Sequence, residues 1–574
     1  MEKLEEYTDK LIEEFEANSK DAERVQRETL KSILEKNASA EYLQSLGLNG
    51  RTDVESFKAC VPLVSHSDIV HYIDRIFDGE MSPFLTAKPL EYLALSSGTA
   101  SGVSKYIPWE PDSTMVNTEK ILHTAFAFRN KAYPIKKGKA LTFTYVRKPK
   151  KNEGGINLAT ATSLVLGDDR YTPIMEAIYS NGCSPDEVKY CPDFEQALYC
   201  HLLCGLIFRE EIQFLYSPFA HTLLHALRTF EDVWEELCND IREGVLSSRI
   251  TDPNPRGAMS KILKPDPELA NLIHKKCTGL KLNNWYGVVQ ELFPNAKYLI
   301  GVMTGTMVPY VEKLRHYAGE VPVVSSDYGA SEGWIAVNVH PTVPAEITSY
   351  TVLPQLGYFE FIPLTENISV DPKPLGLTEV KVGEEYEIVL TTAAGLYRYK
   401  LGDVVKITGF YNSTPEFHFV RRNNILLQIN IDKNTEADLY ISVAAAAKVL
   451  AKEKLDVVDY TSQVDLTTDP GHYVIYWEIN GEASDEVLSE CCNCLDKSFA
   501  DGGYILNRSA HVIGPLELRI LRRGTFHKIL ESSVGRGAAV SQFKTPRCVP
   551  VTNIKVMQIL NDNVVKKYIS THYN

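Results

Sequence analysis

The sequence predicts an α/β protein in which a large N-terminal domain precedes a smaller α+β C-terminal domain. One observation is that helical patterns alternate with short β-branched runs over most of the chain, as is typical of α/β architectures. A second is that the elements become shorter after Arg421-Arg422-Asn423-Asn424, over about 150 residues, a usual domain size. We therefore expect an N-terminal domain over residues 1–425 and a C-terminal domain over residues 426–574.

The individual elements follow from hydrophobic periodicity in chain order. In the N-terminal part, the patterns predict helices over 19–36 and 111–130 and strands over 93–97, 321–325, 334–339 and 386–391. In the C-terminal part they predict helices over 435–453, 484–499 and 525–534 and strands over 472–479 and 516–521. This mixture of short helices and strands is what a compact α+β domain requires.

The charge balance argues against a nucleic acid or a membrane as partner. The 60 Lys and Arg residues face 74 Asp and Glu residues, and the net charge of −14 repels phosphate backbones and anionic surfaces. The acidic start, Met1 to Glu6, lacks the basic cap and apolar stretch of a secretory signal. No segment approaches the roughly 20 consecutive apolar residues of a membrane-spanning helix. We expect a soluble, cytoplasmic monomer that acts on small molecules.

The cysteines predict core packing rather than disulfides or zinc. Eleven cysteines are scattered along a long chain, unlike the dense sets of small secreted domains. Cys491, Cys492 and Cys494 contain one Cys-x-x-Cys spacing, but no second pair or nearby histidine completes a zinc site. They share one face of the helix predicted over 484–499 with apolar residues, so we expect them in the core.

A segment rich in glycine and hydroxyl side chains, from Leu95 to Lys105, has the composition of a phosphate-binding loop. Its glycines permit tight turns and close backbone approach, its hydroxyls donate to phosphate oxygens, and Lys105 supplies a positive charge. It is not a Walker loop, because that motif and the helix that should follow its lysine are absent. Taken alone, the segment fits a surface turn equally well.

Two later segments supply the partners that such a loop needs. Asp327 to Glu332 follows one predicted strand, and Gly395 to Asp403 follows another. The Glu332 carboxylate can hold Mg²⁺ against phosphate oxygens, and the Asp403 carboxylate can accept both ribose hydroxyls. Three segments with separate roles make a nucleotide site the better interpretation.

These segments resemble the adenylate-forming superfamily, with its phosphate loop, its Tyr-Gly-x-Ser-Glu segment and its Tyr-Arg-x-Gly-Asp segment. Over nearly the whole chain the resemblance narrows to the plant Gretchen Hagen family of acyl-acid amido synthetases. The motifs that carry it are Ser96-Ser97-Gly98-Thr99, Thr124-Ala125-Phe126-Ala127-Phe128-Arg129-Asn130, Leu314-Arg315-His316-Tyr317-Ala318-Gly319, Asn430-Ile431-Asp432-Lys433-Asn434-Thr435-Glu436 and Gln542-Phe543-Lys544-Thr545-Pro546-Arg547-Cys548.

The resemblance implies an enzyme with a large adenylate-forming N-terminal domain and a small, mobile C-terminal cap. With ATP and Mg²⁺ it would convert a carboxylic acid to an acyl adenylate, release pyrophosphate, and pass the acyl group to an amino acid with loss of AMP. Lys544 would act catalytically on the α-phosphate, and Glu332 would hold the metal. One departure from the family pattern is Ala100, where a serine is usual, so one donor to pyrophosphate is missing.

The remaining roles are carried over residue by residue. ATP would contact Ser96, Ser97, Gly98, Thr99, Lys105, Tyr328, Gly329, Ala330, Ser331, Glu332 and Asp403. The acyl acid would contact Thr118, Leu122, Thr162, Val165, Tyr216, Pro218, Ser326 and Trp334. The amino acid would contact Thr160, Ala161 and Thr162.

The substrates suggested by the resemblance are jasmonic acid and isoleucine. Residues 124–130 and Phe219-Ala220-His221 are most similar to the jasmonate-conjugating branch, with the auxin-conjugating branch as the alternative. Leu122 and Ser326 are not the commonest residues of the jasmonate branch. One methylene of fit is worth about 1–3 kcal/mol, so these two positions bear on the choice of acid.

Three other functions remain as alternatives. Gly329 to Gly333 matches the Gly-x-Ser-x-Gly elbow of serine hydrolases, with Ser331 as nucleophile, but a strand rather than a helix is predicted to follow it. His221 and His225 have the i, i+4 spacing of metal ligands, although no glutamate lies between them in the usual arrangement. A non-catalytic hormone-binding protein would be expected to have lost Lys105, Glu332, Asp403 or Lys544, and all four are present.

Overall fold

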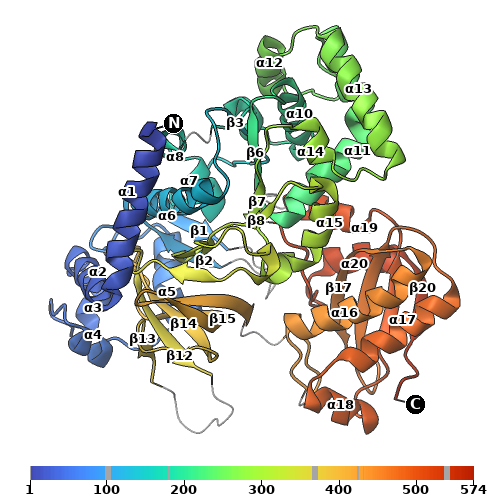
Figure 1. Ribbon diagram of the computed structural model, residues 1–574. Helices are drawn as coiled ribbons and strands as arrows, with labels where there is room; N and C mark the ends of the chain where they lie inside the picture. Colours follow the sequence, from blue (N-terminus) through green and yellow to red (C-terminus); the bar gives the residue numbers. More distant parts are fainter. Residues whose placement is uncertain are drawn as a thin grey trace. The chain divides into compact units, whose positions relative to one another are not determined.

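The computed structural model describes residues 2–96, 105–178, 181–364, 373–422, 426–430, 432–535 and 543–573 (Figure 1). The chain forms two compact units, and each is built from more than one stretch of sequence. Unit 1 comprises Met1–Ser96, Tyr106–Leu401 and Val405–Phe419. Unit 2 comprises Ser97–Lys105, Gly402–Val404 and Val420–Asn574. Serines and glycines at positions 97–104 that were assigned to the phosphate loop lie outside the described residues.

The N-terminal part of the chain holds most of the helices and strands. Its helices are α1 (Glu2–Lys20), α2 (Ala22–Lys36), α3 (Glu41–Ser45), α4 (Val54–Cys60), α5 (His66–Phe77), α6 (Pro111–Ala132), α7 (Ala161–Leu166), α8 (Tyr171–Ala177), α9 (Asp186–Lys189), α10 (Phe194–Ile207), α11 (Ala220–Glu243), α12 (Pro253–Ile262), α13 (Pro267–Leu282), α14 (Val288–Leu292) and α15 (Val308–Ala318). Its strands are β1 (Tyr92–Leu95), β2 (Tyr106–Trp109), β3 (Lys139–Thr142), β4 (Lys150–Lys151), β5 (Asn157–Thr160), β6 (Ile212–Phe219), β7 (Leu299–Val302), β8 (Val323–Ser325), β9 (Tyr328–Ala330), β10 (Gly333–Val337), β11 (Tyr350–Val352), β12 (Tyr358–Pro363), β13 (Leu375–Gly376), β14 (Glu385–Thr391), β15 (Tyr399–Tyr411) and β16 (Thr414–Arg422).

A parallel sheet in the order β3-β6-β7-β8 organises the middle of the chain. Helix α11 packs on β6 and β7, α10 packs on β3, and α15 packs on β8 (Figure 1). Burial on both faces explains the apolar strand sequences. The strands approach closely at Gly301 of β7, where a Cβ atom would lie 2.5 Å from the Ser217 carbonyl oxygen, so only glycine fits.

The larger sheet is mostly antiparallel and runs in the order β13-β12-β14-β15-β16-β11-β10-β9. A smaller sheet in the order β2-β1-β5-β4 joins the same hydrophobic core, to which α1 and α2 contribute Phe15 and Leu30. Helix α6 begins at Pro111, after Glu110, whose carboxylate accepts a hydrogen bond from the Ser113 N–H at 2.8 Å. This N-cap fixes the start of a helix that packs on β10 and α7.

Unit 2 is an α+β domain around the sheet β17-β18-β19-β20. Its helices are α16 (Glu436–Leu450), α17 (Asp485–Ser498), α18 (Gly502–Ser509), α19 (Thr525–Gly535) and α20 (Ile554–Asp562), and its strands are β17 (Val457–Asp465), β18 (His472–Ile479), β19 (Glu517–Leu521) and β20 (Val564–Ile569). Helices α16 and α17 pack side by side (Figure 1). Cys491 and Cys492 are fully buried in this core with unpaired thiols, in keeping with the expected packing role.

Most of the predicted elements are present with small changes at their ends. The strand predicted over 472–479 has both of its ends, and the helix predicted over 435–453 begins one residue later because Thr435 is its N-cap. The helix predicted over 19–36 is wrong at its start. Asp21 leaves the helical conformation, with φ −127° and ψ 50°, so Ser19 and Lys20 end α1 and α2 begins at Ala22.

Candidate active site

The carboxyl ends of the parallel strands present one group of predicted site residues. Strand β8 ends at Ser325, and Ser326 and Asp327 follow it directly. The Ser326 N–H donates to the Gly301 carbonyl at 2.7 Å, and the hydroxyls of Ser325 and Tyr350 hydrogen-bond at 2.8 Å. Open α/β sheets bind their ligands at this edge, so the position of Ser326 agrees with a place in a substrate site.

A buried ion pair fixes the segment that leads to Tyr328. The Arg129 Nη1 of α6 donates to Asp327 Oδ2 at 3.4 Å, and the Asn338 N–H donates to Asp327 Oδ1 at 3.2 Å. Both charged side chains are less than a tenth exposed. Burial raises the pKa of Asp327, and the Arg129 charge opposes that rise. The sequence analysis named both residues in motifs but gave neither a role, although Arg129, a charged residue directly after Thr124 to Phe128, was a usable signal.

The predicted Tyr-Gly-x-Ser-Glu segment forms a tight hairpin. Ala330 of β9 pairs with Gly333 of β10, which leaves Ser331 and Glu332 as the two turn residues. Gly329 pairs with Trp334, and a Cβ atom at Gly329 would lie 2.7 Å from Cε3 of the indole ring. The ring therefore lies across the glycine backbone, and position 329 has no room for a side chain.

The hairpin also removes the structural basis of the hydrolase alternative. A nucleophile elbow runs from a strand into a helix, which holds the serine on a strained turn. Here Ser331 lies between two antiparallel strands, and β10 begins two residues after it. Ser331 is thus a turn residue with the geometry of a hairpin.

Tyr328, predicted to contact the adenine, is buried among aromatic rings. Its ring centroid lies 5.2 Å from that of Phe417 in an edge contact and 5.5 Å from that of Tyr350. Phe419 is 6.2 Å away. This cluster fixes the first residue of the hairpin, and only the later hairpin residues, from Gly329 on, are partly or fully exposed.

Glu332 is the predicted metal ligand, and its carboxylate is partly exposed at the hairpin turn. The Tyr399 hydroxyl donates to its Oε1 at 3.5 Å, which is long for a hydrogen bond. Carboxylate oxygens are the ligands that Mg²⁺ prefers, usually together with phosphate oxygens and water. The donor chemistry at position 332 therefore fits Mg²⁺.

Several predicted acyl-acid contacts meet where α6, α7 and β10 pack together. The Trp334 Nε1–H donates to the Thr118 hydroxyl at 2.9 Å, and that hydroxyl donates to the Thr114 carbonyl at 2.8 Å. Leu122 of α6 and Val165 of α7 are partly exposed and pack against the same core as Trp334. The hydrogen bond thus brings Thr118 and Trp334 together, and Leu122 follows Thr118 by one turn of α6.

The predicted amino-acid contacts lie at the start of α7. The Thr160 hydroxyl is the N-cap of this helix and accepts from the Ser163 N–H at 3.3 Å. Ala161 and Thr162 occupy the first turn and are partly exposed, whereas Thr160 is buried. Thr160 therefore has a structural role as a cap, and Ala161 and Thr162 are the more accessible of the three.

Tyr216 and Pro218 lie in the second half of strand β6, and Tyr216 packs against a different core from Trp334. Tyr216 packs against the small core of Phe126, Phe214 and Tyr298. Burial raises the pKa of Tyr216 to about 12, and the Asp327 carboxylate adds to the rise. Tyr216 is thus neutral and placed near the Arg129–Asp327 pair.

Unit 2 contains the other charged residues that were assigned to the nucleotide. The Arg422 Nε lies 3.2 Å from Asp403 Oδ1, the predicted ribose acceptor. Lys544 is partly exposed, and burial lowers its pKa to about 8, with the Arg422 charge lowering it further and the Glu436 and Asp403 carboxylates opposing this. Of the predicted loop, Ser96 and Lys105 are described, whereas Ser97, Gly98 and Thr99 lie outside the described residues.

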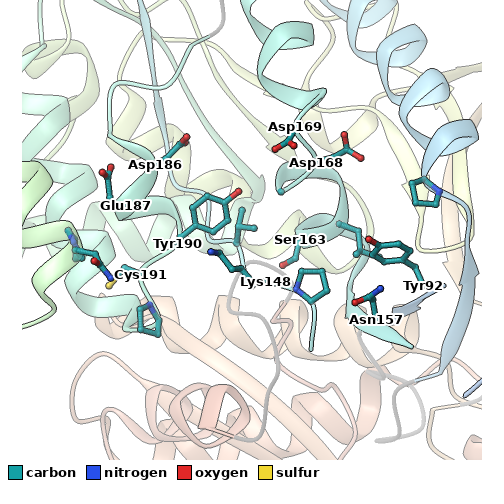
Figure 2. A pocket seen from close by; sticks show the side chains of 18 of the residues that line it. Tyr92, Lys148, Asn157, Ser163, Asp168, Asp169, Asp186, Glu187, Tyr190 and Cys191 are labelled. Atoms are coloured by element: carbon teal, nitrogen blue, oxygen red, sulfur yellow. The ribbon is translucent and has the colours of Figure 1, made fainter. Parts of the chain in front are cut away.

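An acidic groove that the sequence analysis did not single out opens in unit 1 (Figure 2). Its volume is about 1120 Å³, and its lining includes five carboxylates and Lys148. Arg170 binds one of them, at 2.7 Å from Asp168, and Lys189 lies 3.1 Å from Asp186. None of the predicted contact residues lines the groove, but its wall includes Ser163, which follows Thr162 in α7. The carboxylates are Asp168, Asp169, Asp186, Glu187 and Asp252.

His221 and His225 are packed as aromatic rings on α11. Their ring centroids are 6.5 Å apart and nearly parallel, and His225 stacks on Phe194 at 5.5 Å. The His221 ring meets Tyr310 edge-on at 5.2 Å. Each of the two rings thus packs against other aromatic side chains.

The fold has counterparts among solved structures. A solved structure of 2-hydroxyisobutyryl-CoA ligase shares the fold, with a TM-score of 0.50, 10% identity, and 95% of this chain and 92% of that chain covered. Family models match residues 11–323 (GH3 family N-terminal domain), 350–422 (GH3 family central domain) and 437–553 (GH3 family C-terminal domain). The chain belongs to the GH3 family, as its motifs predicted.

Relatives of known activity match over the full length. A jasmonoyl–L-amino acid synthetase of Nicotiana attenuata is 58% identical, with 100% of this chain and 99% of the relative covered. A second, from Oryza sativa, is 57% identical over 98% of each chain. An indole-3-acetic acid-amido synthetase of Arabidopsis thaliana is 46% identical over 100% of each. The solved GH3.15 acyl acid amido synthetase has a TM-score of 0.88 at 37% identity, with 98% of this chain and 96% of that chain covered.

Within the part of the chain that the structure describes, no helix is both long and apolar enough to cross a membrane.

Proposed function

We propose that this protein is an ATP-dependent acyl-acid amido synthetase that joins jasmonic acid to an amino acid, with isoleucine as the preferred amine. The observation that carries the proposal is the likeness, over the full chain, to jasmonoyl–L-amino acid synthetases at 57–58% identity. The auxin-conjugating relatives are 37–46% identical, which makes auxin the second candidate. Leu122, Val165 and Trp334 are partly exposed apolar side chains, which suits an apolar acid of either kind.

The first half-reaction is attack of the substrate carboxylate on the α-phosphate of ATP, which forms an acyl adenylate and releases pyrophosphate. Negative charge grows on the phosphate oxygens in this step, so a positive side chain aimed at them lowers the barrier. Lys544 supplies that charge, and its pKa of about 8 leaves it mostly protonated at neutral pH. Asp403 accepts the ribose hydroxyls. Bound Mg²⁺, held by Glu332, would supply charge neutralisation at the phosphates.

The second half-reaction is attack of a neutral amine on the acyl carbonyl, with AMP as leaving group. The exposed positions in the first turn of α7, Ala161 and Thr162, are the proposed contacts of the amino acid. Residues 426–574 form a mobile cap that changes orientation between the half-reactions, because one lysine position cannot serve both geometries. Crystals with an ATP analogue and with AMP that had the same cap orientation would contradict this.

The test is acid-dependent exchange of pyrophosphate into ATP, measured with jasmonic, indole-acetic, indole-butyric and benzoic acids in turn. We expect exchange only with Mg²⁺ and an acid present, and the highest kcat/KM with jasmonic acid. The Lys544→Ala variant should lose about 10² to 10³ in turnover, by analogy with single donors removed from oxyanion sites, with little change in ATP affinity. Absence of exchange with every acid would refute the activity, and a preference for indole-acetic acid would refute the choice of acid.

A further inference from the structure

The segment that carries Lys544 has neither helix nor strand geometry of its own over Phe543 to Arg547. It is held instead by strand β17, the edge strand of the unit 2 sheet. The Ser462 N–H donates to the Arg547 carbonyl at 2.9 Å, and the Val549 N–H donates to the Ser462 carbonyl at 2.8 Å. These bonds fix the backbone after position 546, and they leave the two residues next to Lys544 to be fixed by side chains.

Asp459 of β17 supplies that side-chain contact. Its Oδ2 accepts from the Thr545 hydroxyl at 2.6 Å, and its Oδ1 accepts from Arg547 Nη1 at 2.7 Å. All three side chains are buried, with exposed fractions of 7%, 5% and 5% for Asp459, Thr545 and Arg547. The Asp459 carboxylate thus binds Thr545, which follows Lys544 directly, and Arg547, which lies two positions further on.

Arg547, the main partner of this carboxylate, is itself held in place by Tyr460. Arg547 Nη1 also donates to the Tyr460 carbonyl at 2.6 Å, and its guanidinium lies 4.1 Å from the centroid of the Tyr460 ring. The pairing of β17 with β18 shifts register between Val457 and Asp459, so Asp459 lies directly after an irregularity in the strand. Apolar residues of similar size often stabilise a folded protein as well as a buried ion pair does, so stability alone does not call for the Asp459–Arg547 pair.

We propose that Asp459 is a positioning residue for adenylation, which fixes the backbone at Thr545 and thereby directs Lys544 toward the α-phosphate. The inference rests on the proposed function, because it assumes that Lys544 acts on ATP. Asp459 itself does not touch the substrates in this scheme. Asp459 acts on the reaction only through the backbone at Thr545 and the side chain of Lys544.

The first test is Asp459→Asn in the full chain, in the pyrophosphate exchange assay with the best acid. Asparagine keeps the size of the side chain but removes the charge that Arg547 and Thr545 bind. We expect exchange turnover to fall about 10- to 100-fold, as misplacement of a reacting group by roughly 1 Å does, with little change in KM for ATP. Unchanged turnover would overturn the inference.

The matched control is Asp496→Asn in the same unit. The Asp496 carboxylate is 0% exposed, binds Arg508 Nη2 at 2.7 Å, and accepts from the Tyr504 hydroxyl at 2.7 Å. It is a buried ion pair of the same kind on α17 and α18, remote in sequence from Lys544. We expect it to lower Tm as Asp459→Asn does while keeping exchange turnover. Equal loss of exchange in the two variants would mean that only stability was changed, and would overturn the inference.

The double variant Asp459→Asn/Lys544→Ala separates the inference from the function on which it rests. If Asp459 acts through Lys544, removing it should cost nothing more once the lysine is gone. If the turnover losses of the two single variants multiply in the double variant, Asp459 does not act through Lys544 and the inference is overturned. Full exchange in Lys544→Ala alone would refute the role of Lys544, whereas a loss there with full exchange in Asp459→Asn would refute only the present inference.

If Asp459→Asn does not fold, Thr545→Val replaces it, because valine keeps the shape of threonine and removes a single hydrogen bond. The same loss of turnover and the same double-variant result with Lys544→Ala are expected. The pH profile gives an independent readout in either variant. Burial is the largest cause of the lowered pKa of Lys544, so a displaced and more exposed lysine has a higher pKa. The fall of exchange activity at basic pH should therefore move to higher pH in the variant. An unchanged pH profile would contradict the inference.

Discussion

A methyl group added at position 329 is a small change, but the hairpin geometry predicts that it destabilises the protein. In Gly329→Ala the new Cβ atom would lie 2.7 Å from Cε3 and 3.1 Å from Cζ3 of Trp334. Carbon atoms pack at about 3.5–4.0 Å, so the indole ring would have to recede by about 1 Å or β9 would have to move. The ring is fixed on its other side by the 2.9 Å hydrogen bond to Thr118.

The cost follows from these contacts. Overpacking of this kind costs about 1–3 kcal/mol, and losing the Thr118 bond adds about 1 kcal/mol. Because Trp334 and Thr118 are both proposed acyl-acid contacts, we expect a lower free energy of unfolding in urea and a KM for the acid raised at least about fivefold, the factor that corresponds to 1 kcal/mol.

Gly279→Ala is the control for the same substitution in a different setting. Gly279 lies inside α13, and a Cβ atom there meets no atom within 4 Å. Alanine in a helix interior is favoured over glycine by about 0.5–1 kcal/mol, so this variant should gain stability and keep the KM for the acid. An unchanged acid KM and unchanged stability in Gly329→Ala would refute the close packing of the hairpin.

Two further outcomes follow from the charged groups. The proposed role of Lys544 requires its protonated form, and its pKa is lowered to about 8. We therefore expect kcat/KM for exchange to be constant below pH 8 and to fall about tenfold per pH unit above it, and a profile flat to pH 10 would contradict the role. Arg129→Met should lower the free energy of unfolding in urea by about 3–5 kcal/mol, because the Asp327 side chain, only 3% exposed, loses its arginine partner. A loss below about 1 kcal/mol would contradict the structural importance of this ion pair.

Local signals in the sequence were sufficient for most of unit 2. The helix that starts after Thr435 has a capping box with Asp438, and β18 contains the apolar run Tyr473 to Trp477, so both could be predicted from neighbouring residues alone. The break at Asp21 could not, because the hydrophobic periodicity of α2 continues back into α1. A single residue outside the helical region of φ and ψ leaves little trace in such a pattern.

The site was predictable as a set of motifs but not as a set of contacts. The Glu332 turn and the strand that follows it were expected from the spacing of Tyr328 to Gly333 and from the alternation after it. The Arg129–Asp327 pair joins residues 198 positions apart, and Asp459 meets Thr545 across 86 positions. Such pairings depend on how strands are ordered in the sheets, which no local pattern encodes. The acidic groove is likewise formed by residues spread from Tyr92 to Pro255.

The discontinuous composition of unit 2 limits how this enzyme can be recombined with its relatives. A chimera that exchanged only the last 150 or so residues would import Lys544 and Arg422 while keeping the host's Lys105 and Asp403, which belong to the same compact unit. The 3.2 Å contact between Asp403 and Arg422 would then join side chains of two parents. Grafting the whole of unit 2 therefore requires the exchange of three separate stretches of sequence, whereas α6, α7 and β10, which carry the proposed acyl-acid contacts Thr118, Leu122, Val165 and Trp334, all lie within unit 1.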